Sequence, residues 1–147
     1  MTKTFVAAML TLAASTVLQA GGFWLQTANP EANAEAKALN AVAIVRVVGC
    51  HDPQQATVTG NSIGVTDGKR VSNPLKLVKL SIPGAYAVTR QWPAEGRWAL
   101  EFVATTGDLV TSLVMPATGD NVDRQAGKYN PGRPAPGDID AVLAGAR

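Results

Sequence analysis

Short runs of strand-forming residues, separated by turn residues, fill the middle of the chain. In the clearest run Trp98, Leu100, Phe102 and Ala104 fall on one face, because successive side chains of a β-strand point to opposite faces. Such runs recur at intervals of roughly 8–12 residues, which is typical of a β-sandwich or barrel. We therefore expect six strands, over residues 41–48, 55–65, 70–80, 85–91, 97–104 and 109–115.

The residues between these runs favour tight turns. Asp67-Gly68 is a strong hairpin signal because both residues tolerate a positive φ angle. Pro83-Gly84 suits a type II turn, in which proline presets one φ angle and glycine supplies the positive one. No amphipathic helix separates the runs, so parallel strands joined by helices are not expected. The pattern predicts an all-β fold with antiparallel strands over residues 41–116.

The two flanks of this region have a different composition. Residues 21–40 are rich in Ala, Asn and Glu and predict a flexible linker, with a possible short strand at 23–27. Residues 117–147 contain many polar, Gly and Pro residues, which indicates an extended tail. This tail ends in an expected short helix at 138–145, for which Asp138 is a suitable N-cap.

The first twenty residues have the pattern of a secretory signal peptide. Lys3 lies in a short leading segment, and no charged residue occurs from Phe5 to Leu18. Small residues follow, and cleavage after Ala20 fits the pattern best. An uncleaved membrane anchor reaching to Leu25 is the alternative, since that length could span a bilayer. We expect a signal peptide at 1–20 and a mature chain that is exported, either periplasmic or extracellular.

Composition and charge agree with one folded domain. The chain has 147 residues, of which 46% are hydrophobic and 16% charged, and its net charge is +2. The basic residues are scattered instead of forming a stripe, so nucleic acid is not an expected partner. The single cysteine, Cys50, has no partner for an internal disulfide. It is therefore buried and inert, reactive, or the link of a disulfide dimer.

Two groups of residues could bind metal ions. Cys50 and His51 carry soft ligands, and Met115 could add a thioether, a combination that suits Cu(I). However, adjacent residues of an extended chain point to opposite faces, and there is no second histidine. Oxygen ligands for calcium could come from a polar cluster, but its spacing lacks the EF-hand pattern. The residues of this cluster are Asp120, Asn121 and Asp123. We therefore expect no bound cofactor.

Two further motifs have both a functional and a structural interpretation. Residues 60–64 match G-x-S-x-G, the pattern around a hydrolase nucleophile, but no helix follows and the only histidine precedes the serine. We expect a glycine-interrupted strand there, in which a bulge is possible. Trp92 lies in a turn, where it could be an exposed binding residue or fold over the edge of the core.

One segment resembles a known group of exported modules. Residues 83–88 and 92–100 form a G-x-Y…G-x-W pattern that includes Tyr86 and Trp98. It is similar to a hairpin in exported Ig-like sandwich modules, including the YtkA-like and FixH-like groups. The resemblance implies an Ig-like sandwich in which the tyrosine and tryptophan enter the core. Copper-linked members of such groups use His and Met clusters, whereas this chain has one His and three Met.

These observations favour a non-catalytic exported Ig-like module that acts in interaction, as a scaffold or as an envelope accessory protein. Its partner would be a protein or envelope component, and it would contact a membrane only if the leading segment stays uncleaved. The alternative is a periplasmic copper-handling protein that uses Cys50 and His51. The residues give no acid–base pair or nucleophile that would indicate an enzyme.

Overall fold

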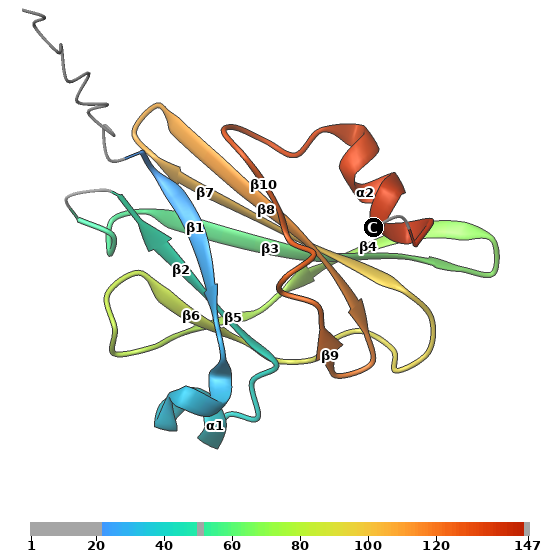
Figure 1. Ribbon diagram of the computed structural model, residues 1–147, viewed down its shortest axis with the longest axis horizontal. Coiled ribbons are helices and arrows are strands. Elements are labelled where there is room, and N and C mark those ends of the chain that lie inside the picture. Colours follow the sequence, from blue (N-terminus) through green and yellow to red (C-terminus); the bar gives the residue numbers. More distant parts are fainter. Residues whose placement is uncertain (1–21, 50–51, 146–147) are drawn as a thin grey trace, which may run out of the picture.

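The computed structural model describes residues 22–49 and 52–145. Their strands form two antiparallel sheets that pack face to face, which confirms the expected all-β sandwich (Figure 1). The first sheet has the order β1 (Trp24–Ala28), β2 (Ala43–Val48), β6 (Ala85–Val88) and β5 (Leu77–Lys79). The second has the order β10 (Lys128–Asn130), β8 (Leu109–Thr118), β7 (Trp98–Thr106), β3 (Thr57–Thr66) and β4 (Lys69–Leu75), and β9 (Asn121–Val122) pairs with the end of β8.

The strand order is that of an Ig-like sandwich. In that fold an A-B-E-D sheet faces a G-F-C sheet, to which a C′ strand can be added. Here β1-β2-β6-β5 takes the first arrangement and β8-β7-β3-β4 the second. The expected single strand over residues 70–80 is wrong, because the chain leaves one sheet after β4 and enters the other at β5. Pro74, which has no N–H to donate, is tolerated because β4 is an edge strand.

The expected hairpin between Tyr86 and Trp98 is also wrong. Tyr86 lies on β6, which pairs with β2 and β5, whereas Trp98 lies on β7 in the opposite sheet. The segment between them therefore crosses the sandwich instead of reversing within one sheet. Both side chains are nevertheless buried.

The G-x-S-x-G motif is part of the core packing between β3 and β7. Gly60, Ser62 and Gly64 lie on the same face of β3, which is continuous and has no bulge. A Cβ atom on Gly60 would lie 3.1 Å from the Phe102 ring, and one on Gly64 would lie 2.5 Å from the Trp98 ring. The glycines therefore make room for two aromatic rings of the neighbouring strand, which is a structural role.

Residues 22–40 are folded rather than a linker. The possible strand at 23–27 is present as β1, which pairs along its length with β2. A 3-10 turn, η1 (Pro30–Ala32), and the helix α1 (Ala34–Ala38) follow it. The Asn33 side chain caps α1 by accepting a hydrogen bond from the Ala36 N–H at 2.9 Å. Ala36 is completely buried against the outer face of the first sheet, so packing stabilises this short helix.

The region after residue 116 is also more ordered than an extended tail. β8 continues past Pro116, which lies between the part of β8 that pairs with β10 and the part that pairs with β9. The helix α2 (Pro136–Leu143) begins two residues earlier than expected, with Pro136 in its first turn. Asp138 is therefore not the N-cap, but its carboxylate accepts a hydrogen bond from the Ala135 N–H at 3.2 Å. Within residues 22–49 and 52–145 no helix is long and apolar enough to cross a membrane.

The helix α2 covers the outer face of the second sheet. Val142 packs there against Ile63, Ala99 and Val114. Asp138 is only 5% exposed, and its carboxylate contacts the Lys128 ammonium at 2.6 Å and accepts a hydrogen bond from the Asn130 amide at 2.9 Å. The bond from Lys128, and to a lesser degree the one from Asn130, lowers the pKa of Asp138.

Replacing Gly64 with alanine should destabilise the sandwich. The new Cβ would collide with the Trp98 ring, so we expect the free energy of unfolding to fall by about 1–3 kcal/mol in chemical denaturation. Gly137→Ala is the control, because no atom lies within 4 Å of its Cβ position and alanine favours a helix. Equal stability of the two variants would contradict this account of the motif.

Asp138→Asn should loosen α2 and change the response to acid. The folded-state pKa of Asp138 is lowered, so its stabilisation is complete above the ordinary carboxyl pKa of about 4 and is lost as pH falls through the folded value. We expect the free energy of unfolding of the variant at pH 7 to be about 1–2 kcal/mol lower than that of the wild type. Acidification should then destabilise the variant less than it destabilises the wild type. Asp140→Asn is the matched control, since Asp140 makes an exposed ion pair with Arg70. A loss as large in the control would refute the role of Asp138.

Candidate functional site

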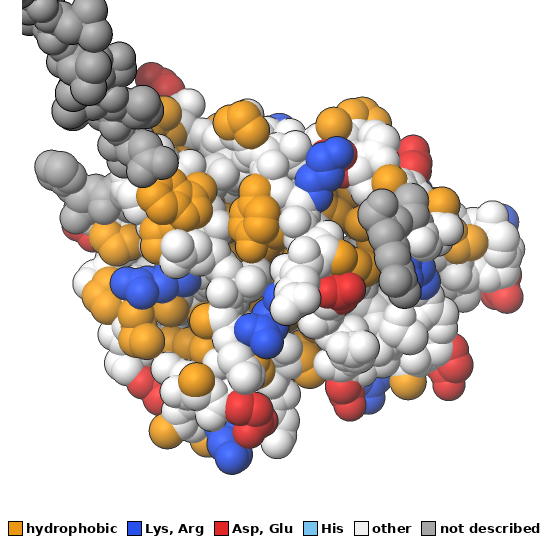
Figure 2. All heavy atoms as spheres, in the orientation of Figure 1, with side chains coloured by type: hydrophobic (Ala, Val, Ile, Leu, Met, Phe, Trp, Pro, Cys, Tyr) orange, Lys and Arg blue, Asp and Glu red, His pale blue; other side chains and the backbone are white. Residues whose placement is uncertain are grey.

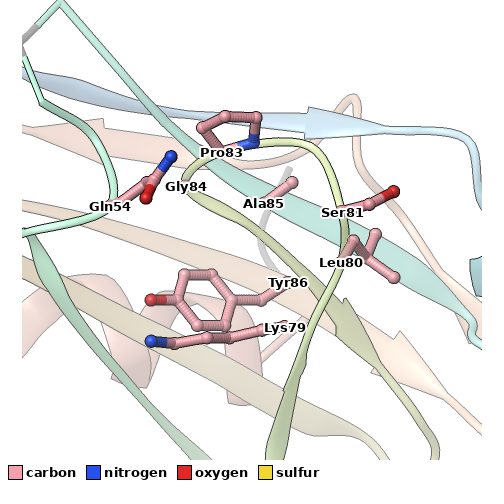
Figure 3. A pocket seen from close by; sticks show the side chains of 8 residues that line it. All are labelled: Gln54, Lys79, Leu80, Ser81, Pro83, Gly84, Ala85 and Tyr86. Carbon is pink, nitrogen blue, oxygen red and sulfur yellow. The ribbon is translucent and has the colours of Figure 1, made fainter.

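A hollow of about 200 Å³ lies at the turn that joins β5 to β6 (Figure 3). One wall is the turn itself with the adjoining ends of both strands. The opposite wall comes from the loop that follows β2. The residues that line the hollow are Gln54, Lys79, Leu80, Ser81, Pro83, Gly84, Ala85 and Tyr86.

The turn is fixed by its own hydrogen bonds and by one glycine. The Leu80 N–H donates to the Ala85 carbonyl at 3.0 Å, which closes a four-residue loop. Gly84 has a φ angle of 74°, as the Pro-Gly pattern predicted. A Cβ atom on Gly84 would lie 2.7 Å from the Cβ of Pro53, so the loop after β2 rests directly on this turn. Close approach at Gly84 therefore brings Gln54 to the hollow.

Two carboxylates hold the walls of the hollow from outside. Glu35 of α1 accepts hydrogen bonds from the Ser81 N–H, at 3.0 Å, and from the Ser81 hydroxyl. These bonds lower the pKa of Glu35. Asp52 accepts a hydrogen bond from the Gln54 N–H at 3.2 Å and shapes the loop. Both acids lie behind the walls, and neither lines the hollow.

Three polar side chains converge on the hollow. Lys79 and Tyr86 are partners across the β5–β6 ladder, and Figure 3 shows their side chains running side by side toward the wall that carries Gln54. Tyr86 is only 7% exposed, and its side chain lines the hollow. Its hydroxyl can donate or accept a hydrogen bond there. Lys79 takes part in none of the ion pairs between described residues, and it is the charged residue among the described residues of the lining.

Trp92 is not an exposed binding residue. Its side chain is 3% exposed and belongs to the core between the sheets. The indole N–H donates to the Gly119 carbonyl at 2.9 Å, which satisfies its polar atom. The second interpretation of the sequence, a tryptophan folded over the edge of the core, is therefore correct.

The proposed copper ligands are not brought together by the described structure. Met115 is completely buried and packs in the core between the sheets, so its thioether does not reach the surface. Cys50 and His51 lie outside the described residues. Within residues 22–49 and 52–145, no three His, Cys, Asp or Glu residues form a group that could hold a metal ion.

The proposed calcium ligands have other roles. Asp120 forms an ion pair with Arg90 at 2.6 Å. Asp123 accepts a hydrogen bond from the Ala126 N–H at 3.1 Å and so stabilises the turn after β9. Both carboxylates therefore have a role in the local structure. Ser62 likewise has no catalytic setting, since it is completely buried and its hydroxyl has no partner in the described part of the chain.

The surface carries no concentrated charge on the face shown in Figure 2. Lys and Arg side chains stand apart from one another there, and acidic side chains lie between them. Hydrophobic side chains are more frequent around β1, where Trp24 is 37% exposed. This face therefore offers scattered contacts, whereas the hollow collects several polar groups at one place.

Sequence reasoning missed the hollow, although part of it could have been found. The Pro83-Gly84 turn fixes the register of its hairpin, and that register pairs Lys79 with Tyr86. No comparable signal places Gln54, because its loop reaches the hollow through a tertiary contact with Gly84.

Comparison with known proteins adds no relative: no family model matches the chain, and no curated protein or solved structure shows significant similarity to it.

Replacing Gly84 with alanine should destabilise the protein by more than backbone strain alone, and it should displace the loop that carries Gln54. Any L-residue at this positive φ angle costs about 1–2 kcal/mol, and contact with Pro53 should add about 1–3 kcal/mol. Gly96→Ala is the matched control, since its φ angle is 82° but its Cβ position has no neighbour closer than 3.9 Å. Denaturant unfolding and the NMR shift of the Gln54 side-chain amide would measure the effect. Similar losses in both variants, with Gln54 unmoved, would show that the loop does not depend on Gly84.

Proposed function

We propose that this chain is a non-catalytic, exported Ig-like module that binds its partner at the hollow beside the β5–β6 turn. The observation that carries the proposal is the pairing of Tyr86 with Lys79, whose polar ends lie together at the hollow (Figure 3). Tyr86 is largely buried, so its hydroxyl has a restricted position from which it can donate a hydrogen bond to a ligand.

The position of the hollow supports a binding role. Loops at the ends of an Ig-like sandwich are held by a rigid scaffold and commonly contact partners. The β5–β6 turn is fixed on one side by α1, through Ser81, and on the other by the loop that contains Pro53. The polar groups that line the hollow include an ammonium, a phenol and an amide, and each of them can donate a hydrogen bond to a ligand. Binding at a prearranged site loses less conformational entropy than binding at a mobile one.

Export is supported by the leading segment, and it is compatible with the position of the first described strand. Residues 1–20, which have the signal-peptide pattern, lie outside the described residues. The first strand, β1, begins at Trp24, so cleavage after Ala20 would leave every described strand intact. Processing at that site is therefore compatible with the whole sandwich.

The export half of the proposal predicts one processed product. A C-terminally tagged full chain, expressed in a Gram-negative host, should appear in the periplasmic fraction with an intact mass that begins at Gly21. Leu10→Arg should abolish processing because it puts a charge into the apolar segment, whereas the matched variant Leu10→Ile should not. A full-length membrane-bound product would favour the anchor instead, and an unprocessed cytoplasmic product would refute export.

The binding half is tested with the mature, isotopically labelled chain. Small neutral, anionic and cationic compounds, such as acetamide, acetate and methylammonium, would be titrated while the NMR signals of Gln54, Lys79 and Tyr86 are followed. Saturable shifts confined to these residues, caused by any of the compounds, would support a site at the hollow. Lack of a response to all three compounds would overturn the hollow as the binding site.

A further inference from the structure

We infer that the hollow beside the β5–β6 turn recognises a carboxylate group, with Tyr86 and Lys79 as its main contacts. The inference rests on the proposed function and specifies its ligand. The carboxylate can belong to a small free acid or to an acidic side chain of a polypeptide. Both sources present the same planar pair of oxygens to the hollow, and the experiment below separates them.

Tyr86 supplies a directed hydrogen-bond donor. Tyr86 is only 7% exposed and is the cross-strand neighbour of both Val45 and Lys79, so packing restricts the position of its hydroxyl. The side chain lines the hollow (Figure 3), so a ligand oxygen could accept a hydrogen bond from this hydroxyl. Bonds to an ionised acceptor are stronger than bonds between neutral groups.

Lys79 determines the charge that the hollow prefers. Its ammonium lies beside the Tyr86 hydroxyl and faces the wall that carries Gln54 (Figure 3). Lys79 is exposed and takes part in none of the ion pairs between described residues, so its ammonium is available to a ligand. The nearby acids are already engaged: Glu35 bonds to Ser81, and Asp52 bonds to the backbone of Gln54. A ligand carboxylate would therefore find an ammonium and a phenol together.

The size of the hollow limits the ligand. Its volume is about 200 Å³, below the roughly 300–1,000 Å³ of sites that enclose a drug-sized molecule. The hollow can therefore hold an acid of a few heavy atoms or the end of a longer side chain. The amide of Gln54, from the opposite wall, can donate to the second carboxylate oxygen or accept from a neighbouring N–H.

The experiment compares ligands of equal shape and different charge. Propionate and propionamide would be titrated into the mature chain at low ionic strength, with the NMR signals of Tyr86 and Gln54 as the readout. A capped tripeptide, acetyl-Ala-Glu-Ala-amide, and its Gln counterpart test the polypeptide source. We expect the acid of each pair to bind at least about tenfold more tightly than the amide, and added salt to weaken it. Tighter binding of the tripeptide than of propionate would identify a polypeptide, and the reverse a free acid.

Three variants locate the contacts. Lys79→Gln and Tyr86→Phe should each weaken propionate binding by roughly threefold to tenfold or more. Lys76→Gln is the matched control, because it removes the same charge from a neighbouring residue outside the hollow, and it should bind like the wild type. Melting temperatures would verify that every variant is folded.

The outcomes separate this inference from the function on which it rests. Equal binding of acid and amide at the hollow would refute the carboxylate but keep a binding site there. Unchanged binding in Lys79→Gln and Tyr86→Phe would refute the assigned contacts. If neither member of either pair shifts these signals, no ligand of this class occupies the hollow and the inference fails.

Discussion

The second sheet depends on a close fit between two glycines of β3 and two aromatic rings of β7. On the face of β3 that points into the core, Gly60 and Gly64 leave space that Phe102 and Trp98 of β7 fill. The chain has one cysteine, so no internal disulfide can support the fold, and packing must stabilise it. Because β3 and β7 lie between β4 and β8 in the sheet, the fit also affects the surface on which the outer helix α2 packs.

The sequence predicts the strands well where alternation is strong, and poorly where tertiary contacts decide. The inward face of β7 follows from the positions of its aromatic residues, and the Asp67-Gly68 and Pro83-Gly84 turns are where their patterns place them. The change of sheet at Lys76 has no local signal, because strand-forming residues continue on both sides of it. The short strands β9 and β10 depend on the free edge of β8, which is not visible before the fold is assembled.

The sequence predicts only one side of the hollow, because tertiary contacts decide the other side. A tight turn fixes which residues face each other in a hairpin, so the pairing of Lys79 with Tyr86 is local information. The wall opposite this pair is not local information, because Gln54 reaches the hollow from the loop after β2. Trp92 and Met115, which the sequence offered as candidate site residues, are instead core residues, since their large apolar surfaces are more stable when buried.

Two short helices are attached to the sandwich by carboxylates, and one of them is bonded to a residue that lines the hollow. Asp138 attaches α2 through Lys128, and Glu35 attaches α1 through Ser81. In both cases the bonds lower the pKa of the acid, so the attachment is complete above the ordinary carboxyl pKa of about 4 and weakens as pH falls through the lower folded value. Because Ser81 lines the hollow, acid would loosen its wall in the same range in which a carboxylate ligand takes up a proton. Neutral pH therefore favours both the formed hollow and the charged ligand that we propose for it.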